Sequence, residues 1–288
     1  MNIFQTTLKN QAVFSGYGLH TGDIARVILR PAEENHGIVF FYNERGGQIH
    51  RLPADILHTV STDFCTVLGK GNISIKTIEH LMAAIYASGL DNLKVELFSD
   101  EIPILDGGAE FYMKGIRESG FHRQGVARKY LRVLKPCRVK SSSSFAGFSP
   151  ASVPCFDISI SFSSRVIGKQ RITFTLDIDY FTRNLAHART FGFIKDIERL
   201  WAAGFALGSS CENSVIIGVD DTVLNPSGLR TYDDFVRHKA LDAIGDTALL
   251  GYPFLGKFYS FKGGHRINVE ASRCLLEKQE YFEIVELR

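Results

Sequence analysis

The pentapeptide His238–Asp242 (HKALD) has the residue types and the spacing that could bind a metal ion. Its first and last residues are four apart, so on a helix they lie on one face, one turn from each other. An imidazole and a carboxylate at that spacing can chelate one divalent cation. Asp246 extends the same face by another turn. The alternative is a surface His–Asp pair, which stabilises a helix by only about 0.2–0.5 kcal/mol.

A second pair with chemical potential, Glu79 and His80, lies in the segment Thr77–Ile85 (TIEHLMAAI). Apolar residues recur there at i, i+3, i+4 and i+7, which predicts a helix capped by Thr77 or Ser74. An acidic residue beside a metal-binding histidine commonly holds a general base over metal-bound water. The alternative is an exposed Glu–His pair on a surface helix.

A third histidine, His265, follows two glycines in the segment Phe261–His265 (FKGGH). Two glycines make a flexible or tight turn, which can present an imidazole into a cleft. Histidine is the side chain best suited to proton transfer near neutral pH. The alternative is a hairpin turn that carries an incidental histidine.

Composition is typical of a soluble globular protein with one large or two medium domains: 288 residues, 45% hydrophobic and 22% charged. The net charge of +2 gives no bulk electrostatic reason to expect nucleic acid or membrane partners. No apolar run reaches the roughly 18 residues that span a bilayer, and Met1–Gln5 lacks the features of a signal peptide. The five widely spaced cysteines predict reduced thiols in a cytoplasmic protein.

The elements that must position these residues fall into two halves, and in each half strands precede helices. Strands are expected at 25–29, 38–42, 65–68, 73–75, 92–98, 130–139, 156–162, 171–176, 214–219 and 257–261. Further helices are expected at 109–119, 180–188, 196–203, around His238 and at 269–278, and the residues 65–75 read as a hairpin. This order favours an α+β fold with two domains over alternating βαβ units. We place the domains at 1–127 and 128–288, with a polar linker at 124–129 and a flexible hairpin tip at 141–144.

Other motifs are weaker. The glycine-rich segment Gly16–Gly22 lacks the Lys-Ser/Thr ending of a P-loop. The sequence contains neither a Gly-x-Ser-x-Gly nucleophile elbow nor a His-Glu-x-x-His motif. Basic residues do not cluster with aromatic ones, so nucleic-acid recognition has no support.

Several motifs in order carry a family resemblance that covers the chain from its start to about His265. They are GYGLHTG at 16–22, TIEHLMAA at 77–84, PILDG at 103–107, ARTFGF at 188–193, RHKALDAIGD at 237–246 and KGGH at 262–265. On these motifs the sequence resembles the UDP-3-O-acyl-N-acetylglucosamine deacetylase family, the zinc-dependent deacetylases of lipid A biosynthesis. The resemblance implies two α+β domains of similar architecture, each a sheet packed with helices, and an active site between them.

The resemblance also implies the roles of the site residues. One zinc ion would be held by three protein ligands, His80, His238 and Asp242, with an open position for water. Glu79 would be the general base and a protonated His265 the general acid. Thr190 would help to hold the oxyanion, and Asp246 would orient or charge-stabilise His265.

For the substrate, the resemblance implies a UDP-sugar that carries an acyl chain. Lys239, Phe191, Lys262 and His20 would contact it, with Phe191 against the sugar ring, and an apolar passage in the second half would accept the 3-O-acyl chain. A cytoplasmic monomer without stable membrane insertion is expected. The family often has serine at positions 108 and 263 and glycine at 209, where this chain has Gly108, Gly263 and Ser209. The segment 141–144 matches the family poorly.

Two other classes remain open at this point. A different zinc amidohydrolase would share the metal ligands and differ only in its nucleotide and acyl contacts. A non-catalytic binding module of similar fold would leave the set of histidines and carboxylates unexplained, and bound zinc per chain would discriminate it.

Overall fold

The structure is a computed structural model that describes residues 2–44 and 47–287. Met1, which begins the N-terminal pentapeptide and the first predicted domain, lies outside the described residues, as does Arg288 at the end of the second domain. None of the described helices combines the length and apolar character that crossing a bilayer requires. All five cysteines are free thiols, as predicted.

The β-branched and aromatic runs of the first half form a five-stranded sheet. Its order is β2 (Ala12–Tyr17), β3 (Ile24–Pro31), β9 (Leu93–Leu97), β4 (Ile38–Asn43) and β5 (Ile49–Pro53). Helix α2 (Glu110–Ser119) packs against β2. The predicted hairpin is confirmed as β7 (Val67–Lys70) and β8 (Ile73–Ile75), with β6 (Thr59–Ser61) beside β7.

The second half forms a seven-stranded sheet. Its main path is β12 (Cys137–Ser141), β13 (Ser144–Ser149), β18 (Phe254–Phe261), β11 (Lys129–Val133) and β19 (Phe282–Glu286). Strand β14 (Pro154–Ser161) pairs with β18 in parallel and with β15 (Lys169–Thr175) antiparallel. In β14 every second residue, Phe156, Ile158 and Ile160, is buried, so one face of this sheet packs against the core.

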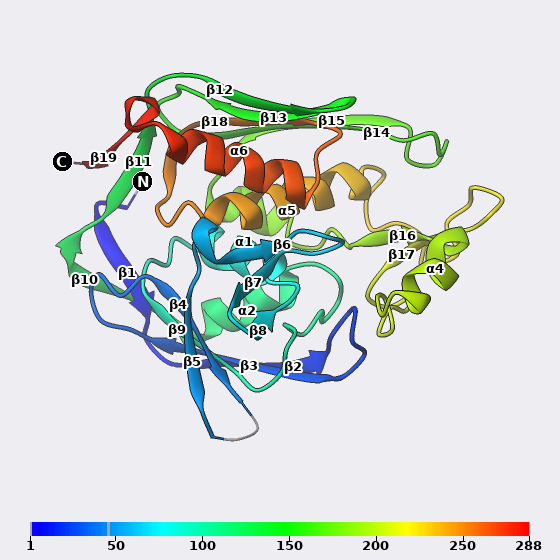
Figure 1. The fold of residues 1–288 in the computed structure, drawn as a ribbon, viewed down its shortest axis with the longest axis horizontal. Coiled ribbons are helices and arrows are strands. Elements are labelled where there is room, and N and C mark those ends of the chain that lie inside the picture. Colours follow the sequence, from blue (N-terminus) through cyan, green and yellow to red (C-terminus); the bar gives the residue numbers. More distant parts are fainter. Residues whose placement is uncertain (1, 45–46, 288) are drawn as a thin grey trace.

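Helices fill the space between the two sheets, as Figure 1 shows. They are α1 (Glu79–Ala87), α5 (Asp234–Ala248) and α6 (His265–Glu277). Helix α5 is buried at every position except Arg237 and Lys239, and it packs against α1, α6 and β14. A Cβ at Gly245 would lie 2.0 Å from the carbonyl oxygen of Glu79, so α5 and α1 approach backbone to backbone there. The predicted α+β class is confirmed.

The remaining elements lie around this core. Strands β16 (Phe191–Phe193) and β17 (Val215–Ile217) pair in parallel and project to one side together with α4 (Ile197–Ala202) (Figure 1). Strand β1 (Phe4–Leu8) pairs with β10 (Phe121–Ala127). The others are α3 (Ile178–Asn184) and the short 3-10 helices η1 (Ile56–His58), η2 (Ile194–Asp196) and η3 (Gln279–Tyr281).

Three predicted elements are wrong. Residues 124–127 of the expected linker belong to β10, where the buried Gln124 accepts a hydrogen bond from Asn92 (2.7 Å) and donates one to the carbonyl of Ala32 (3.0 Å). The expected strand at 130–139 is two strands, β11 and β12, with Pro136 between them. The last helix begins at His265, four residues earlier than expected, and strand β19 follows it.

The predicted caps of α1 are also wrong, because no side chain caps this helix. The hydroxyl of Thr77 donates instead to the buried carboxylate of Glu101 (2.7 Å), and Thr77 adopts a positive φ of 60°. Glu101 also accepts hydrogen bonds from the backbone N–H groups of His20 (2.9 Å) and Thr21 (2.8 Å). One buried carboxylate therefore fixes both the start of α1 and the loop that carries His20.

Candidate active site

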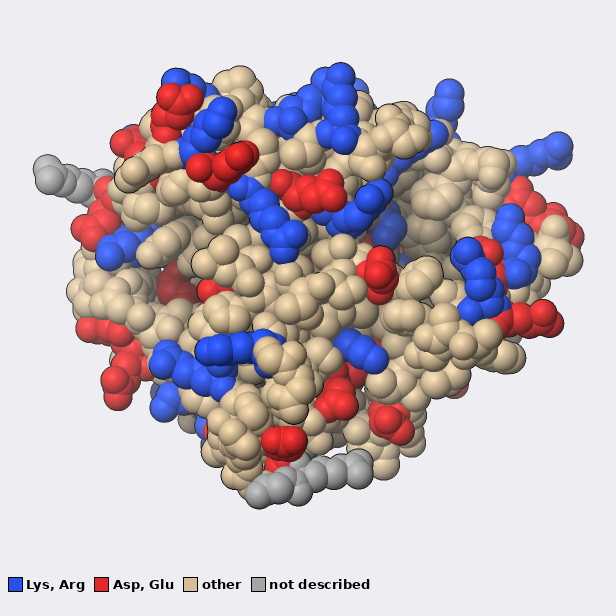
Figure 2. All heavy atoms as spheres, in the orientation of Figure 1, with Lys and Arg blue, Asp and Glu red and all other residues tan. Residues whose placement is uncertain are grey.

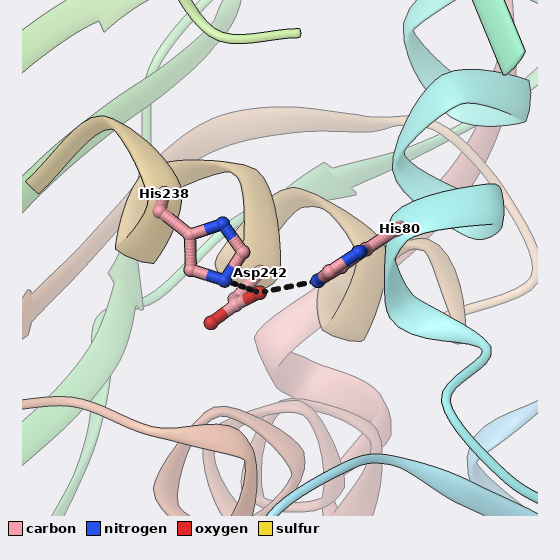
Figure 3. A group of neighbouring side chains, drawn as sticks. All are labelled: His80, His238 and Asp242. Carbon is pink, nitrogen blue, oxygen red and sulfur yellow. Dashed lines mark ion pairs between the residues drawn. The ribbon is translucent and has the colours of Figure 1, made fainter. Parts of the chain in front are cut away.

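Helices α1 and α5 bring three side chains together, which we call the metal cluster: His80, His238 and Asp242. Figure 3 shows His80 reaching from α1 toward His238 and Asp242, which lie one turn apart on α5. One potential ligand atom from each residue lies within 4.8 Å of the others. All three are buried, with 3%, 2% and 1% of their surface exposed. The interpretation of His238 and Asp242 as a surface pair is therefore wrong.

Hydrogen bonding fixes which nitrogen of His238 has a free lone pair. Burial lowers the pKa of His238 to about 3, so the imidazole is neutral near pH 7. Its Nδ1 lies 3.2 Å from the carbonyl oxygen of Ala188, which can only accept, so Nδ1 carries the proton. Nε2 then presents a lone pair toward Asp242 Oδ1, 3.2 Å away. Two lone pairs facing each other repel unless a cation lies between them.

The second imidazole of the metal cluster, that of His80, faces the same carboxylate oxygen of Asp242. Nε2 of His80 lies 3.5 Å from the same Oδ1 atom, and this buried oxygen has no hydrogen-bond donor among the described residues. An orphaned carboxylate oxygen with two imidazole nitrogens around it fits a divalent cation better than a hydrogen-bonded structural role. Two nitrogens and one oxygen form the three-ligand set typical of catalytic zinc sites.

Lys239 contacts the metal cluster directly, and the substrate contact that the family resemblance implies for it stays a prediction. Its Nζ donates to Asp242 Oδ2 (2.8 Å), the oxygen that does not face the histidines. Burial alone raises the pKa of Asp242, but His238 and Lys239 hold it well below its ordinary value. Asp242 therefore stays ionised, as a metal ligand must.

Beside the metal cluster lies a second group, the His265 cluster: Glu79, Asp246 and His265. Nε2 of His265 is 3.8 Å from Glu79 Oε1 and 3.9 Å from Asp242 Oδ2, while Nδ1 is 3.1 Å from Asp246 Oδ2. Glu79 and Asp246 are 3% and 0% exposed, so the exposed-pair interpretation of Glu79 and His80 is wrong. The turn at Gly263 and Gly264 places His265 at the first position of α6.

Charge and burial shift the protonation of this cluster in opposite ways. Burial raises the pKa of Glu79, although His265 and His80 partly oppose the rise. Burial alone lowers the pKa of His265, but the carboxylates of Asp246, Glu79 and Asp242 raise it to about 9. A neutral-pH site with a buried carboxylate and a protonated imidazole 3.8 Å apart can accept one proton and deliver another.

Two residues of this region were not singled out in the sequence: Thr66 and Asn268. The Thr66 N–H donates to Glu79 Oε2 (3.0 Å) and its hydroxyl to Asp246 Oδ1 (2.5 Å). Asn268 donates to Asp246 Oδ2 (2.9 Å). Asn268 lies three residues after His265 on α6, so a correct helix start would have placed both on one face. Thr66 is 180 residues from Asp246, and no local pattern reveals that contact.

Thr190 directly precedes β16, and Phe191 is the first residue of that strand. The Thr190 N–H donates to the carbonyl of Gly107 (2.8 Å), and its own carbonyl accepts from Val215 (2.8 Å). The ring centroid of Phe191 is 6.2 Å from that of His238, and Lys239 Nζ lies 5.4 Å from the same ring. Phe191 therefore lies beside His238, and both Thr190 and Phe191 line an apolar cavity.

That cavity has a volume of about 240 Å³ and is lined mainly by apolar side chains of β16, η2 and α4. Phe191, Ile194, Leu200 and Trp201 form much of its wall, and Thr190 opens onto it. A cavity of this size and polarity fits a hydrocarbon chain. A larger cavity of about 350 Å³ lies at the opposite ends of α1 and α5, beside Tyr86 and Ala248, and does not border either cluster.

His20 and Lys262 lie at the margins of the site. His20 borders the apolar cavity, where its Nδ1 accepts from the Ala206 N–H (3.3 Å) and burial lowers its pKa to about 4. Lys262 is exposed, with its Nζ 5.7 Å from the Phe261 ring. No hydrogen bond or ion pair between described residues joins either side chain to the two clusters.

The family departures also have structural settings. A Cβ at Gly108 would lie 2.6 Å from the carbonyl oxygen of Ala186 and 2.9 Å from that of Ala188. At Gly263 it would lie 2.9 Å from the hydroxyl of Ser260. Ser209 borders the cavity and donates to the hydroxyl of Ser214 (3.1 Å). The poorly matching segment 141–144 is the turn between β12 and β13, as predicted.

Comparisons with known proteins agree on one family. The family model described as UDP-3-O-acyl N-acetylglycosamine deacetylase matches residues 5–277. Curated relatives named UDP-3-O-acyl-N-acetylglucosamine deacetylase from Brucella melitensis, Brucella suis and Brucella abortus are each 44% identical to the chain over 288 residues. Each alignment covers 99% of this chain and 100% of the relative.

Proposed function

The chain belongs to the UDP-3-O-acyl-N-acetylglucosamine deacetylase family, and on this premise we propose that it hydrolyses the N-acetyl group of UDP-3-O-acyl-N-acetylglucosamine in lipid A biosynthesis. The products are the free amine, UDP-3-O-acyl-glucosamine, and acetate. The observation that carries the proposal is the convergence of His80, His238 and Asp242, whose potential ligand atoms lie within 4.8 Å of one another, beside Glu79 and His265.

We propose that His80, His238 and Asp242 hold one zinc ion. Zinc at such a site supplies Lewis acidity, which acidifies water and polarises a carbonyl oxygen. Neutral His238 offers Nε2 because Ala188 fixes its Nδ1 proton, and ionised Asp242 offers Oδ1. His238 and Asp242 are therefore in the protonation states that metal binding requires.

Glu79 is the proposed general base. Its Oε2 atom is occupied by the Thr66 N–H, so Oε1 is the oxygen left to accept a proton from the attacking water. Burial raises the pKa of Glu79, which makes the carboxylate a better proton acceptor than an exposed one. The water oxygen forms the new bond to the acetyl carbon.

His265 is the proposed general acid. Its pKa of about 9 keeps it protonated at neutral pH, and Nε2 faces Glu79 Oε1 while Nδ1 is held by Asp246. When the C–N bond breaks, Nε2 donates its proton to the departing amine. The hydroxyl of Thr190 donates to the carbonyl oxygen, which becomes negative as water adds.

The substrate contacts follow the shape of the site. The acyl chain occupies the apolar cavity, Phe191 lies against the sugar ring, and His20 contacts the substrate from the cavity rim. Lys262 and Lys239 offer cationic groups to the polar part of the UDP-sugar. An alkyl hydroxamate tests this arrangement, because each buried CH₂ adds about 0.8 kcal/mol, or roughly fourfold in affinity. Equal inhibition by short-chain and long-chain hydroxamates would argue against an acyl-binding cavity.

A deacetylation assay on UDP-3-O-acyl-N-acetylglucosamine, with bound zinc measured per chain, tests the proposed function directly. We expect about one zinc per chain, release of acetate, and loss of both activity and zinc on chelation. Zinc-dependent release of acetate from a different amide, with none from this substrate, would instead identify another amidohydrolase. A chain without zinc and without activity would overturn the proposal.

We further propose that the two domains are residues 1–127 and 128–288 and that the protein is a cytoplasmic monomer without stable membrane insertion. Strand β10 ends at Ala127 and β11 begins at Lys129, and these strands belong to different sheets. The free cysteines suit a reducing compartment. Light scattering would test the monomer, and fractionation of cells would test the location.

A further inference from the structure

Thr66 stands between the two carboxylates that flank His265. It is fully buried, directly before β7, and its two donors reach two different helices. The N–H donates to Glu79 Oε2 on α1 (3.0 Å), and the hydroxyl donates to Asp246 Oδ1 on α5 (2.5 Å). The Thr66 carbonyl accepts from the N–H of Ile78 at the start of α1 (3.4 Å). Thr66 is thus held firmly against α1 while its hydroxyl reaches α5.

These contacts close a ring of four residues. Thr66 binds Glu79, Glu79 faces His265 (3.8 Å), His265 binds Asp246 (3.1 Å), and Asp246 accepts from Thr66. His265 and Thr66 lie opposite each other in this ring. The position of each carboxylate therefore depends on Thr66 on one side and on His265 on the other.

The two carboxylate oxygens of the buried Asp246 accept hydrogen bonds from different donors. Its Oδ2 atom receives Asn268 (2.9 Å) and the nearer contact of His265 (3.1 Å). Its Oδ1 atom receives the Thr66 hydroxyl and otherwise only the longer contact of His265 (3.3 Å). Without the hydroxyl, a buried carboxylate oxygen would have no well-placed donor, and the carboxylate would rotate to recover one.

We propose that Thr66 is a positioning residue, whose N–H and hydroxyl set the separation and orientation of Glu79 and Asp246 and thereby align the general base with the general acid. This inference rests on the proposed function, since it assigns Thr66 a part in that reaction. Thr66 does not touch the substrate in this role. It acts through Glu79 and through Asp246 on His265.

The role predicts a specific kinetic change. Loss of the hydroxyl misaligns the acid–base pair but leaves the cavity and the metal cluster intact. We therefore expect Thr66→Val, which replaces the hydroxyl by a methyl group of similar size, to lower kcat about 10- to 100-fold while KM changes less than about threefold. Thr66→Ser keeps the hydroxyl and should keep kcat within about threefold of the original protein.

The experiment compares these variants as zinc-loaded proteins on UDP-3-O-acyl-N-acetylglucosamine, with bound zinc and Tm measured for each. Thr247→Val is the matched control, because Thr247 is also fully buried and, among the described residues, its hydroxyl donates only to the α5 carbonyls of Ala243 and Ile244. We expect unchanged zinc content in all three variants and near-original kcat in the control.

A misfolded Thr66→Val protein would not end the test, because Thr66→Ala and Thr66→Ser differ by a single oxygen atom. The serine variant should then be the more active of the two by about tenfold or more. Asn268→Leu, which removes the donor on the other oxygen of Asp246, should also lower kcat without loss of zinc. Equal kcat in the valine and original proteins, or equal impairment of serine and valine variants, would overturn the inference. An original protein that binds zinc but lacks deacetylase activity would overturn the proposed function instead.

Discussion

The metal cluster and the His265 cluster contain the same kinds of side chain, yet the pKa values of His238 and His265 are shifted in opposite directions. The pKa of His238 falls to about 3, whereas that of His265 rises to about 9. Burial acts in the same direction on both, because it disfavours a charged imidazole. The difference therefore comes from their charged neighbours.

His238 has one nearby carboxylate, Asp242, which it shares with Lys239 and with the imidazole of His80. His265 lies among three carboxylates, those of Asp246, Glu79 and Asp242. The number of unshared negative charges thus decides whether a buried histidine is a lone-pair donor or an acid. His238 and His265 can therefore have different chemical roles in one site, because their charged neighbours differ.

The largest expected effect separates the two clusters by metal content. His238→Ala removes a ligand, so zinc should fall from about one per chain to near zero and deacetylation to background. Thr190→Ala, beside the cluster but outside the proposed ligand set, should keep its zinc. Metal analysis by mass spectrometry after dialysis measures both. Full zinc occupancy in a His80→Ala, His238→Ala double variant would contradict the ligand assignment.

The next effect concerns the His265 cluster, whose variants should keep zinc and lose rate. Glu79→Gln and His265→Gln should each lower kcat roughly 10²–10⁴-fold, the usual range for an acid or base. Activity of the original protein should be bell-shaped in pH, with a basic limb where His265, whose pKa is raised by the neighbouring carboxylates, loses its proton. His265→Gln should abolish or move that limb.

Steady-state rates across pH 5–11 would check the assignment of these two roles. Zinc content and circular dichroism serve as controls that each variant is folded and loaded. An unchanged basic limb in His265→Gln together with a lost acidic limb would mean that the roles are reversed. Because the groups of the site titrate together, the roles are assigned by comparing the pH–rate profiles of the variants with that of the original protein.

Much of this comparison could be predicted from the sequence, because the residues of each cluster sit in short local motifs. The spacing of His238, Asp242 and Asp246 predicted one face of a helix, and α5 has that face. The apolar stripe of Thr77–Ile85 predicted α1. Local patterns specify helices well, since a helical face depends only on residues within two turns.

The contacts between distant segments could not be predicted in this way. Thr66 and Asp246 meet where α5 approaches α1 closely at Gly245, and no sequence pattern near Thr66 indicates that approach. The sequence left the burial of Glu79 and His80 open for the same reason, since both lie off the apolar stripe of their own helix and are covered by α5. Strand β10 was missed because its polar Gln124 is satisfied by Asn92 and Ala32, far away in sequence.

A third, smaller effect is a stability difference in the metal-free protein. The folded pKa of His265, about 9, lies above its ordinary value of 6.5. The folded protein therefore holds this proton more tightly than the unfolded chain, so the stabilisation is complete below about pH 6.5 and is lost as pH rises toward 9. Its size is on the order of 3 kcal/mol. Urea unfolding of chelated protein at pH 6.5 and 9.5 should show this loss, and His265→Gln should show much less of it. A loss of the same size in the variant would assign the effect to other groups.

The smallest expected effect concerns Lys239, whose ammonium group contacts Asp242 of the metal cluster. Its Nζ donates a hydrogen bond to Asp242 Oδ2 (2.8 Å), so it orients this carboxylate and partly neutralises its negative charge. A bound zinc ion would also be repelled by the nearby ammonium. Lys239→Met should therefore raise the affinity for zinc several-fold, measured by competition with a chromogenic chelator, and should raise KM if the lysine also binds substrate. Lys262→Met is the matched control, because Lys262 is exposed and forms no ion pair with Asp242 among the described residues. It should leave the zinc affinity unchanged. A weaker zinc affinity in Lys239→Met would contradict this expectation, and it would mean that the hydrogen bond that orients Asp242 affects zinc binding more than the positive charge of Lys239 does.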